Sequence, residues 1–465
     1  MSTKAIVLAA GKGTRMKSDL AKVLHRAAGR SLLDWCLTTL DPLDLDGVVV
    51  VVGHQAADVA AGLPEGVPGG VIATVQEPQL GTADAARVGL EALDPEEEGT
   101  VLVLPGDMPL LETSTFRRLL TAHHDAGAAA SVLSARVDDP TGYGRVVRSA
   151  GEVVAIVEHR DADDEQLAIN EVNTSVYAFD VARLRAAISR VRADNSQSEY
   201  YLTDVIGLLA EGGERIVAVT VADASDAAGV NSHGQLAAVA AVLRRRINES
   251  WMAEGVWMLD PDRVYIDVGV ALDAGARIYP DVYLEGTTTV GAEANIGPDV
   301  HARDSTIAAG ATVRYAVLDA ATVGVDATVG PFSYLRPGAT LGERSKAGAY
   351  VEIKNSIVGD GSKVPHLSYV GDATIGEGSN LGAGTVTVNY DGFAKHRTTI
   401  GDRVRIGSDT MLIAPVTIGD DAYTGAGSVI SSDVAPGALA IERSPQKEVP
   451  GYADRRKDRA QESGT

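Results

Sequence analysis

The sequence predicts two domains of different fold class: an α/β domain with a doubly wound sheet, and an all-β domain built from a short repeat. Up to about residue 230, apolar runs typical of buried strands alternate with segments of helical spacing. After about residue 262 helical spacing disappears, and aliphatic-glycine pairs recur every six residues. We therefore expect an α/β domain over 1–230, a linker with a connecting helix over 231–261, a β domain over 262–449 and a disordered tail over 450–465.

Composition favours a soluble globular protein of the cytoplasm. Hydrophobic residues make up 45% of the 465 residues, which is enough for packed cores. The formal net charge of −22 argues against a nucleic-acid surface, which needs clustered lysine and arginine. The sequence has no apolar run long enough to span a membrane and no signal-peptide pattern at its start. The single cysteine, Cys36, excludes internal disulfides and is expected to be a buried side chain.

The chain opens on an all-apolar run, residues 5–10, which predicts a buried parallel strand. A loop over residues 11–15 follows, with two glycines, a lysine and Arg15, and Lys22 comes shortly after it. Glycines let the backbone approach an anion, and the cations suit a substrate that carries several negative charges. The spacing matches neither the Walker A pattern nor GxGxxG. We therefore predict a phosphate-binding loop of another kind.

Further strands and helices alternate along the first domain. Strands are predicted for the apolar runs at 48–53, 100–107 and 215–221, and helices for Thr115 to His124 and Val181 to Val191. Asp107 ends one of these strands, at the edge of the sheet where α/β proteins bind ligands. An amphipathic connecting helix is then predicted from apolar residues at helical spacing, namely Leu236, Val239, Ala240, Leu243 and Ile247.

The second domain follows a six-residue period. Six residues for each short strand and its corner give three strands in an eighteen-residue coil, with each aliphatic side chain inside a narrow triangular core. The pattern is clearest at three pairs, and it is also present at six others. The clearest are Ile400-Gly401, Ile406-Gly407 and Ile418-Gly419, and the others are Val290-Gly291, Ile296-Gly297, Val323-Gly324, Val329-Gly330, Ile375-Gly376 and Leu381-Gly382.

Two segments break this period. The segment NYDGFAKHRT at 389–398 does not fit a coil and should leave it as a loop. The run SKVPHLSY at 362–369 places His366 where an aliphatic or small residue would be routine. Because departures from a strong period mark functional positions, we expect a site near these two segments.

These motifs resemble known families. LAAGKGTRM at 8–16, followed by Ala21-Lys22, resembles the signature of sugar-nucleotide pyrophosphorylases, and the six-residue repeat resembles the hexapeptide repeat of left-handed parallel β-helices. Over residues 4–445 the chain resembles the bifunctional N-acetylglucosamine-1-phosphate uridylyltransferases and glucosamine-1-phosphate acetyltransferases of bacterial cell-wall precursor synthesis. The resemblance implies a Rossmann-like nucleotidyltransferase domain, a β-helix acetyltransferase domain and a homotrimer.

In the first domain the resemblance implies a uridylyltransferase site. Arg15 and Lys22 would bind phosphates and stabilise charge during attack on UTP, and Mg²⁺ would be held by Asp107 and Asn231. The nucleoside would contact Leu8, Ala9, Ala10, Gly11, Gln76, Gln79, Gly81 and Thr82. The amino sugar of N-acetylglucosamine-1-phosphate would contact Gly144, Glu158 and Asn173, with Asn231 also at the substrate.

In the second domain the resemblance implies an acetyltransferase site. His366 would be the general base that takes a proton from the amine as it attacks the thioester of acetyl-CoA. The phosphate of glucosamine-1-phosphate would be bound by Arg336, Lys354, Tyr369, Asn380 and Lys395. Acetyl-CoA would contact Ala383, Asn389, Tyr390, Ser408, Ala426 and Arg443. No covalent acetyl-cysteine is expected, because Cys36 belongs to the other domain.

The sequence departs from the family pattern at two positions. Asp84 stands where the family often has histidine and adds an acidic group near the nucleotide, and Pro365 restricts the backbone next to His366. Three other functions remain open: a nucleotidyltransferase whose β-helix only regulates or oligomerises, a non-enzymatic scaffold, and a hexapeptide metalloenzyme. The metalloenzyme would need three histidine ligands, and the β domain offers only His301, His366 and His396.

Overall fold

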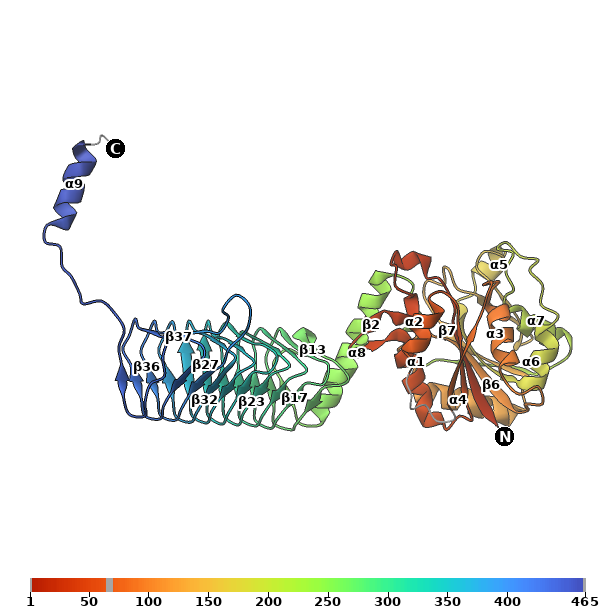
Figure 1. Ribbon diagram of the computed structural model, residues 1–465. Coiled ribbons are helices and arrows are strands. Elements are labelled where there is room, and N and C mark those ends of the chain that lie inside the picture. The colour runs from red at the N-terminus through yellow and green to blue at the C-terminus, as the bar shows by residue number, and fades with distance from the viewer. Residues whose placement is uncertain (1, 64–69, 463–465) are drawn as a thin grey trace. The chain divides into compact units, whose positions relative to one another are not determined.

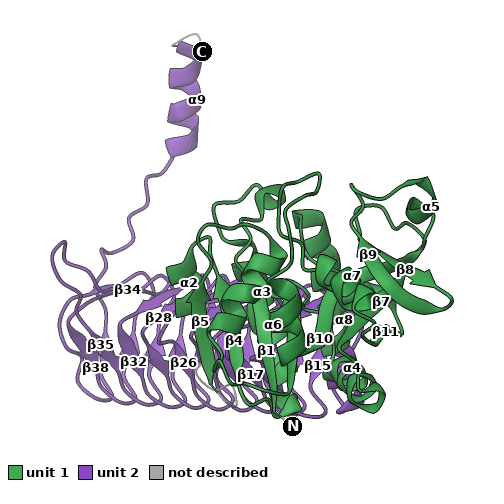
Figure 2. Cartoon of the chain, turned by 90° about the vertical axis from the view of Figure 1, so that its right-hand side faces the viewer, with its two compact units in different colours: residues 1–247 green, residues 248–465 purple. Residues whose placement is uncertain are grey.

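The computed structural model describes residues 2–63 and 70–462. The chain divides into two compact units, residues 1–247 and 248–465, which are coloured separately in Figure 2. Among the described residues, no helix is both long and apolar enough to cross a membrane. The last three residues of the predicted tail, 463–465, lie outside the described part of the chain.

The first unit is built on a nine-stranded mixed sheet (Figure 1). Seven strands form its main path, in the order β11 (Ile216–Thr220), β7 (Ala130–Arg136), β10 (Glu171–Asp180), β6 (Thr100–Pro105), β1 (Thr3–Ala9), β4 (Val48–Val52) and β5 (Val71–Val75). The remaining two, β8 (Arg145–Ser149) and β9 (Glu152–Val157), extend from β10. β10 is antiparallel to both of its neighbours, whereas β6, β1, β4 and β5 are parallel.

Helices pack on both faces of this sheet, as the α/β fold class predicts. Alternate side chains of β1 enter two different cores, with Ile6 in one and Val7 in the other. The Ile6 core includes α3 (Thr82–Glu91), α6 (Val181–Ile188) and α7 (Asp204–Glu211). The Val7 core includes α1 (Leu32–Leu40), α2 (Ala56–Ala61) and α4 (Thr113–Ala126). Cys36 of α1 is buried, and burial raises the pKa of its thiol to about 12.

Short elements complete the first unit. These are the hairpin of β2 (Arg26–Ala27) and β3 (Arg30–Ser31), helix α5 (Asp164–Leu167) and the single 3-10 turns η1 (Thr14–Met16), η2 (Lys22–Leu24), η3 (Asp41–Leu43) and η4 (Ala224–Ala227). The connecting helix α8 (His233–Ala253) spans the boundary between the units. Its Val239 and Leu243 are buried in a third cluster with Met16 and Leu32.

The second unit is a parallel β-helix with three sheets, and the 3-10 turn η5 (Pro261–Arg263) lies between its first two strands (Figure 1). Its first sheet contains β12 (Trp257–Met258), β15 (Arg277–Ile278), β18 (Asn295–Ile296), β21 (Thr312–Val313), β24 (Thr328–Val329), β27 (Lys346–Ala349), β30 (Lys363–His366), β33 (Asn380–Leu381), β36 (Arg405–Ile406), β39 (Tyr423–Thr424) and β41 (Leu439–Ala440). Its second sheet contains β13 (Val264–Ile266), β16 (Val282–Glu285), β19 (Val300–Arg303), β22 (Ala316–Asp319), β25 (Ser333–Leu335), β28 (Glu352–Lys354), β31 (Tyr369–Gly371), β34 (Val386–Val388), β37 (Met411–Ile413) and β40 (Val429–Ile430). Its third sheet contains β14 (Ala271–Leu272), β17 (Thr289–Val290), β20 (Thr306–Ile307), β23 (Thr322–Val323), β26 (Thr340–Leu341), β29 (Ile357–Val358), β32 (Ala373–Ile375), β35 (Thr398–Ile400) and β38 (Val416–Ile418).

The six-residue repeat places its aliphatic side chains in the core, as predicted. All nine aliphatic residues of the pairs that define the repeat are buried. The coil length varies slightly from the expected eighteen residues. Arg277 pairs with Asn295, 18 residues later, whereas Thr312 pairs with Thr328, 16 residues later. The corners absorb this difference, because the strand pairs themselves stay in register.

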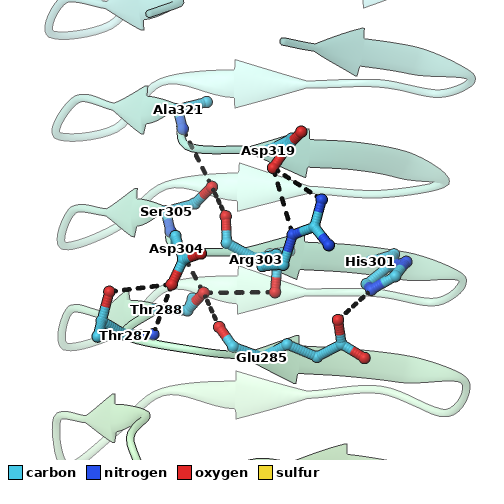
Figure 3. A network of polar contacts seen from close by, with 10 residues as sticks. Glu285, Thr287, Thr288, His301, Arg303, Asp304, Ser305, Asp319 and Ala321 are labelled. Atoms are coloured by element: carbon cyan, nitrogen blue, oxygen red, sulfur yellow. Dashed lines mark hydrogen bonds and ion pairs between the residues drawn. The ribbon is translucent and has the colours of Figure 1, made fainter. Parts of the chain in front are cut away.

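Hydroxyl side chains connect successive coils at the corners. The Ser305 hydroxyl donates to the Arg303 carbonyl at 2.8 Å and accepts from the Ala321 backbone N–H at 3.1 Å (Figure 3). Asp304 accepts from the backbone N–H of Thr287 one coil earlier. These bonds satisfy polar groups that the narrow core cannot pair with strand partners.

The two ends of the β-helix differ. At the first coil the Asn248 side chain is fully buried, and its amide donates to the carbonyls of Pro261 and Val264 at 2.8 and 2.9 Å. At the last coil Leu439 and Ile441 are 61% and 53% exposed. Apolar side chains are exposed at both ends, because Trp257 and Leu259 of the first coil are 44% and 57% exposed. The ends differ instead in the residues next to them, since Asn248 of α8 is bonded to the first coil and no residue of α9 is buried.

The C-terminal segment differs from the expected disordered tail, since it contains helix α9 (Tyr452–Glu462). Alanine, arginine, lysine and glutamate in this segment are good helix formers, so local preference alone favours the helix. None of its residues is buried. The prediction of a disordered tail was based on its polar composition, and helix propensity was not considered.

Candidate functional site

All the residues predicted for the uridylyltransferase site lie around one cleft of the first unit. The cleft has a volume of about 1220 Å³ and opens at the carboxyl ends of β1, β5 and β6. The fifteen predicted residues in its lining are Leu8, Ala9, Ala10, Gly11, Arg15, Lys22, Gln76, Gln79, Gly81, Thr82, Asp107, Gly144, Glu158, Asn173 and Asn231.

The glycine loop after β1 leaves its backbone open to the cleft. A Cβ atom added at Gly11 would meet no protein atom within 4 Å. Gly13 has a φ of 61°, and a Cβ there would lie 2.7 Å from the Lys22 Cβ. Gly11 therefore leaves room for a ligand, and Gly13 lets Lys22 pack closely against the loop.

Two cationic side chains and two side chains with acceptor oxygens meet at one point of the cleft. The Lys22 ammonium forms an ion pair with Asp107 and also donates to the side-chain oxygen of Asn231 at 3.2 Å. Arg15 donates to the same Asn231 oxygen at 2.8 Å. Asp107 is buried and follows β6, while Asn231 precedes α8. Because one ammonium reaches both oxygens, Asp107 and Asn231 converge on a single position that a small cation could share with phosphate oxygens.

A second polar group lies beyond the end of β5. The side-chain amide of Gln76 donates to the Gly81 carbonyl at 3.0 Å and to the Asp84 carboxylate at 2.8 Å. Gly81 has a φ of 124°, and a Cβ there would lie 2.5 Å from the Tyr200 carbonyl oxygen, so this turn needs glycine. Asp84 does not line the cleft, contrary to the expectation that it adds charge beside the nucleotide, because Gln76 and Arg87 engage its carboxylate.

The residues predicted for the amino sugar form one group. A Cβ added at Gly144 would lie 3.5 Å from Glu158 Oε1 and 3.6 Å from the Asn173 Cβ. The Thr203 hydroxyl donates to Glu158 at 3.1 Å. Burial raises the pKa of Glu158, and the Asp204 carboxylate acts in the same direction. Glu158 is thus a partly buried acceptor that could bind hydroxyl or amide groups of a sugar.

In the second unit, Asp372 lies at the centre of a polar cluster. It accepts from the side-chain amides of Asn355 at 2.6 Å and Asn389 at 2.5 Å, and the Lys354 ammonium lies 4.0 Å away. The Asn389 amide is also 3.5 Å from the Tyr369 hydroxyl. Burial opposes ionisation of Asp372, but the two amides and Lys354 outweigh it and hold the pKa of Asp372 below its usual value.

Three of the predicted phosphate-binding cations lie near this cluster. The Lys354 ammonium lowers the pKa of Lys395, which shows that the two ammonium groups lie close together although they come from β28 and the loop after β34. Arg336 pairs with Glu352 on the neighbouring strand at 2.8 Å. Glu352 in turn lies opposite Tyr369 in the second sheet. Clustered cations of this kind suit a phosphate group.

His366 ends β30, and Asn380 begins β33 in the same sheet. The His366 side chain is exposed, and its carbonyl accepts from the Ser368 hydroxyl at 2.6 Å. Among the described residues no side chain hydrogen-bonds its imidazole. The ring is therefore available to a substrate. Within the described part of the chain, no hydrogen bond or ion pair joins the side chain of His366 or Asn380 to the Asp372 cluster.

Most residues predicted for acetyl-CoA lie along one corner of the β-helix. Ala383, Ser408 and Ala426 occupy equivalent places in successive coils, linked through backbone bonds between Asp409 and Ala383 at 2.7 Å and between Gly427 and Ser408 at 2.8 Å. Arg443 donates to the Ala426 carbonyl at 2.9 Å. Tyr390, in contrast, lies on the extruded loop.

The extruded loop connects β34 to β35, as the break in the repeat predicts. Tyr390 and Lys395 form an isolated bridge at its base, and Phe393 at its tip is 97% exposed. Asn389 at its start is buried, and its side-chain amide donates to Asp372. The loop therefore carries both an anchored residue and an exposed apolar tip.

The three histidines of the β-helix have separate surroundings. His301 contacts Glu285 at 2.8 Å (Figure 3), His396 contacts Asp391 at 2.6 Å, and His366 ends a different strand. Within residues 2–63 and 70–462, no group of three or more histidine, cysteine, aspartate or glutamate side chains is placed to hold a metal ion. This arrangement gives the metalloenzyme alternative no set of three histidine ligands.

Sequence reasoning missed Asp372 and Asn355. A signal was available, because Asn355, Asp372 and Asn389 are spaced by 17 residues, which is one coil. Each of the three follows a strand of the second sheet, so this spacing places them at equivalent corners of neighbouring coils. The expected coil of eighteen residues is one residue longer, and for that reason the alignment was not predicted. Thr203 and the contact between Asp84 and Gln76 were also missed, and these depend on the packing of α3 and α7, which no repeat reveals.

Comparisons with known proteins agree with this division. The model of the MobA-like NTP transferase domain matches residues 5–198, and that of the bacterial transferase hexapeptide matches residues 397–432. The chain is 50% identical to the "Bifunctional protein GlmU" of Streptomyces avermitilis, over 97% of this chain and 94% of that protein. It is also 50% identical to the protein of that name from Mycolicibacterium vanbaalenii, and 46% identical to that from Brevibacillus brevis, with 97% of this chain and 93% and 97% of those proteins covered.

Proposed function

Because this chain belongs to the family of bifunctional GlmU proteins, we propose that it makes UDP-N-acetylglucosamine in two steps, one in each unit. The β-helix of the second unit, which is of the left-handed hexapeptide type, transfers an acetyl group from acetyl-CoA to glucosamine-1-phosphate. The first unit then joins the N-acetylglucosamine-1-phosphate to the uridylyl group of UTP and releases pyrophosphate. The observation that carries this proposal is the convergence of Lys22, Asp107 and Asn231 in a cleft lined by all the residues expected there.

In the first unit the reaction needs no covalent intermediate with the protein. A phosphate oxygen of the sugar attacks the α-phosphorus of UTP, the bond from that phosphorus to the β-phosphate breaks, and pyrophosphate leaves. Arg15 and Lys22 stabilise the charge that develops on the phosphates. Gly144, Glu158 and Asn173 hold the sugar, and the residues around Gln76 hold the base.

Asp107 and Asn231 would hold Mg²⁺ in this cleft. Their oxygen atoms converge on one point, and oxygen is the ligand type that Mg²⁺ prefers. Two protein ligands suffice, because Mg²⁺ usually completes its shell with water and substrate phosphates. When bound, the ion would neutralise phosphate charge and favour departure of pyrophosphate.

In the second unit His366 acts as the general base. It takes a proton from the amino group of glucosamine-1-phosphate as the nitrogen attacks the thioester carbon, the bond from carbon to sulfur breaks, and the CoA thiolate leaves. Arg336, Lys354 and Lys395 bind the sugar phosphate together with Tyr369 and Asn380. Acetyl-CoA lies along the corner formed by Ala383, Ser408, Ala426 and Arg443. Asn389 and Tyr390 contact acetyl-CoA, and the bond from Asn389 to Asp372 holds the start of the extruded loop.

The β-helix forms a homotrimer in this proposal. Its second sheet exposes Tyr265, Tyr283 and Tyr334, which are 36%, 40% and 39% accessible, and the first two rings stack at 4.4 Å. Flat apolar faces of this kind are commonly covered in solenoid proteins by association. The exposed Phe393 of the extruded loop then meets a neighbouring copy.

Because UTP and acetyl-CoA are cytoplasmic metabolites, we place the protein in the cytoplasm.

One assay tests both steps. The protein is incubated with glucosamine-1-phosphate, acetyl-CoA, UTP and Mg²⁺, and free CoA, pyrophosphate and UDP-N-acetylglucosamine are measured together. We expect equal amounts of all three products. Pyrophosphate release from N-acetylglucosamine-1-phosphate without release of CoA from glucosamine-1-phosphate would favour the nucleotidyltransferase whose β-helix only regulates. Neither product in folded protein would favour a scaffold.

A further inference from the structure

Asp84 lies behind the cleft and contacts a residue that lines it. It belongs to the first turn of α3, and its side chain is 7% exposed. One carboxylate oxygen accepts from the Gln76 amide at 2.8 Å, and the other accepts from the Arg87 guanidinium at 2.6 Å. Asp84 therefore touches no ligand space itself, but it holds the side chain that does.

The contacts of Gln76 fix the orientation of its amide. The amide nitrogen carries two hydrogens, which go to the Gly81 carbonyl and to Asp84. A backbone carbonyl and an ionised carboxylate can only accept hydrogen bonds, so the nitrogen must face both of them. What Gln76 retains for the cleft is its side-chain oxygen, which is an acceptor only.

We propose that Asp84 is a positioning residue that makes Gln76 present an acceptor to the nucleobase, and so selects bases with a ring N–H. This inference rests on the proposed function, which places the base at Gln76. Uracil has an N–H at position 3, whereas cytosine has a lone pair there. The Gln76 oxygen attracts the first and repels the second.

The alternative amide orientation explains why a second acceptor matters. Turned by 180°, the Gln76 side chain has nearly the same shape but offers a donor to the cleft, which suits cytosine. That orientation would place its oxygen against the Gly81 carbonyl and the Asp84 carboxylate. Asp84 adds a charged acceptor to a neutral one, and hydrogen bonds to charged groups are the stronger kind.

The test compares UTP with CTP in three variants of the full chain. Asp84→Leu removes the acceptor at similar size, Asp84→Asn keeps an oxygen that can accept from Gln76, and Glu91→Gln removes the other ion pair of Arg87 as a control. Calorimetry gives the Kd of each nucleotide, and pyrophosphate release gives kcat/KM with N-acetylglucosamine-1-phosphate. Acetyl transfer and circular dichroism monitor folding.

We expect the preference for UTP over CTP to fall about 10-fold in Asp84→Leu, because a site with misplaced hydrogen-bonding groups loses discrimination of at least this order. It should stay within about threefold of the parent in Asp84→Asn and unchanged in Glu91→Gln. If Asp84→Leu does not fold, Asp84→Ala carries the same expectation.

Three results would overturn the inference: an unchanged preference in a folded variant that lacks the acceptor, an equal loss in Asp84→Asn and Asp84→Leu, or equal binding of UTP and CTP by the parent protein. The second result would assign the effect to the charge of Asp84 rather than to its acceptor role. Selective binding of UTP without any pyrophosphate release would instead overturn the proposed function, and the binding ratios of the variants would still decide the role of Asp84.

Discussion

The Lys22 ammonium compensates a buried carboxylate at the point where a polyphosphate is expected to bind. Asp107 alone would repel phosphate, and burial would make its charge costly. Lys22 forms an ion pair with Asp107 and compensates its negative charge, and Arg15, which donates a hydrogen bond to Asn231, adds a second positive charge. The cleft can therefore still bind anions.

We predict that Asp107→Ala lowers uridylyl transfer by about 10³-fold or more, since metal binding contributes several kcal/mol of charge stabilisation. Acetyl transfer should stay near its normal rate, because Asp107 belongs to the first unit only. Asp125→Ala, at an exposed position of α4, is the matched control and should affect neither reaction. Rates of pyrophosphate and CoA release measure the two steps, and parallel loss of both in stable protein would contradict the assignment.

A second residue-scale effect concerns stability in acid. His123 of α4 is buried beside the Ser131 hydroxyl at 3.0 Å, and burial lowers the pKa of His123 to about 4 from an ordinary value of 6.5. Below pH 6.5 the unfolded chain therefore binds a proton that the folded chain does not. The free energy of unfolding should fall between pH 6.5 and 4, by up to about 3 kcal/mol.

His123→Gln should remove this part of the pH dependence while keeping a polar partner for Ser131. Urea unfolding at pH 7 and pH 4.5 measures it. The decrease in unfolding free energy on acidification should be smaller in the variant than in the parent protein. An identical decrease in both would show that His123 is not the responsible group.

At the scale of elements, the repeat predicted the β-helix core but not the polar contacts between its coils. Aliphatic residues such as Ile400 were placed correctly because their period alone determines which face they occupy. The contact between Asp372 and Asn389 depends on the number of residues in each coil, and this number varies between 16 and 18 along most of the solenoid. Family resemblance predicted the cleft residues of the first unit. The contact between Asp84 and Gln76 could not be predicted, because it depends on how α3 packs against the end of β5.

We predict that His366→Ala lowers acetyl transfer by about 10² to 10⁴-fold, the usual contribution of a positioned general base. Uridylyl transfer should not change. His301→Ala is the matched control, because it removes a histidine of the same domain that is paired with Glu285. The CoA release rate decides the matter, and equal rates in the two variants would exclude His366 as the base.

At the scale of the whole molecule, the chain consists of two units, and each has its own sheets and its own buried core. The first unit has its own sheet and three hydrophobic clusters, and the second unit has its three-sided helix. Helix α8 crosses the boundary, so a fragment should keep it intact.

We predict that a fragment of residues 1–253 folds and retains uridylyl transfer to N-acetylglucosamine-1-phosphate, while it loses acetyl transfer. The reason is that the cleft draws all its lining from the first unit. Pyrophosphate release from the purified fragment measures this. Release no faster than in buffer, from a fragment shown to be folded, would mean that the first unit depends on the second.

We also predict that mixed trimers regain acetyl transfer. If the extruded loop of one chain meets the His366 strand of a neighbour, then inactive His366→Ala and Asn389→Ala chains, refolded together, should form some intact sites. CoA release should exceed that of either variant refolded alone. Verified mixed trimers without recovery would place both residues in the same chain's site.

Because the two ends of the β-helix are covered differently, we expect its coils to unfold from the C-terminal end. A solenoid is stabilised by contacts between neighbouring coils, so an uncovered terminal coil frays before an interior one. Asn248 of α8 is buried and bonded to the first coil, whereas no residue of α9 is buried against the last coil. Fraying therefore begins near Ser408 and Arg443, where acetyl-CoA is proposed to bind. Bound acetyl-CoA would stabilise this end, because a ligand that binds only the folded coils raises their free energy of unfolding. Since fraying starts at this end, the stabilisation would also protect the coils that precede it.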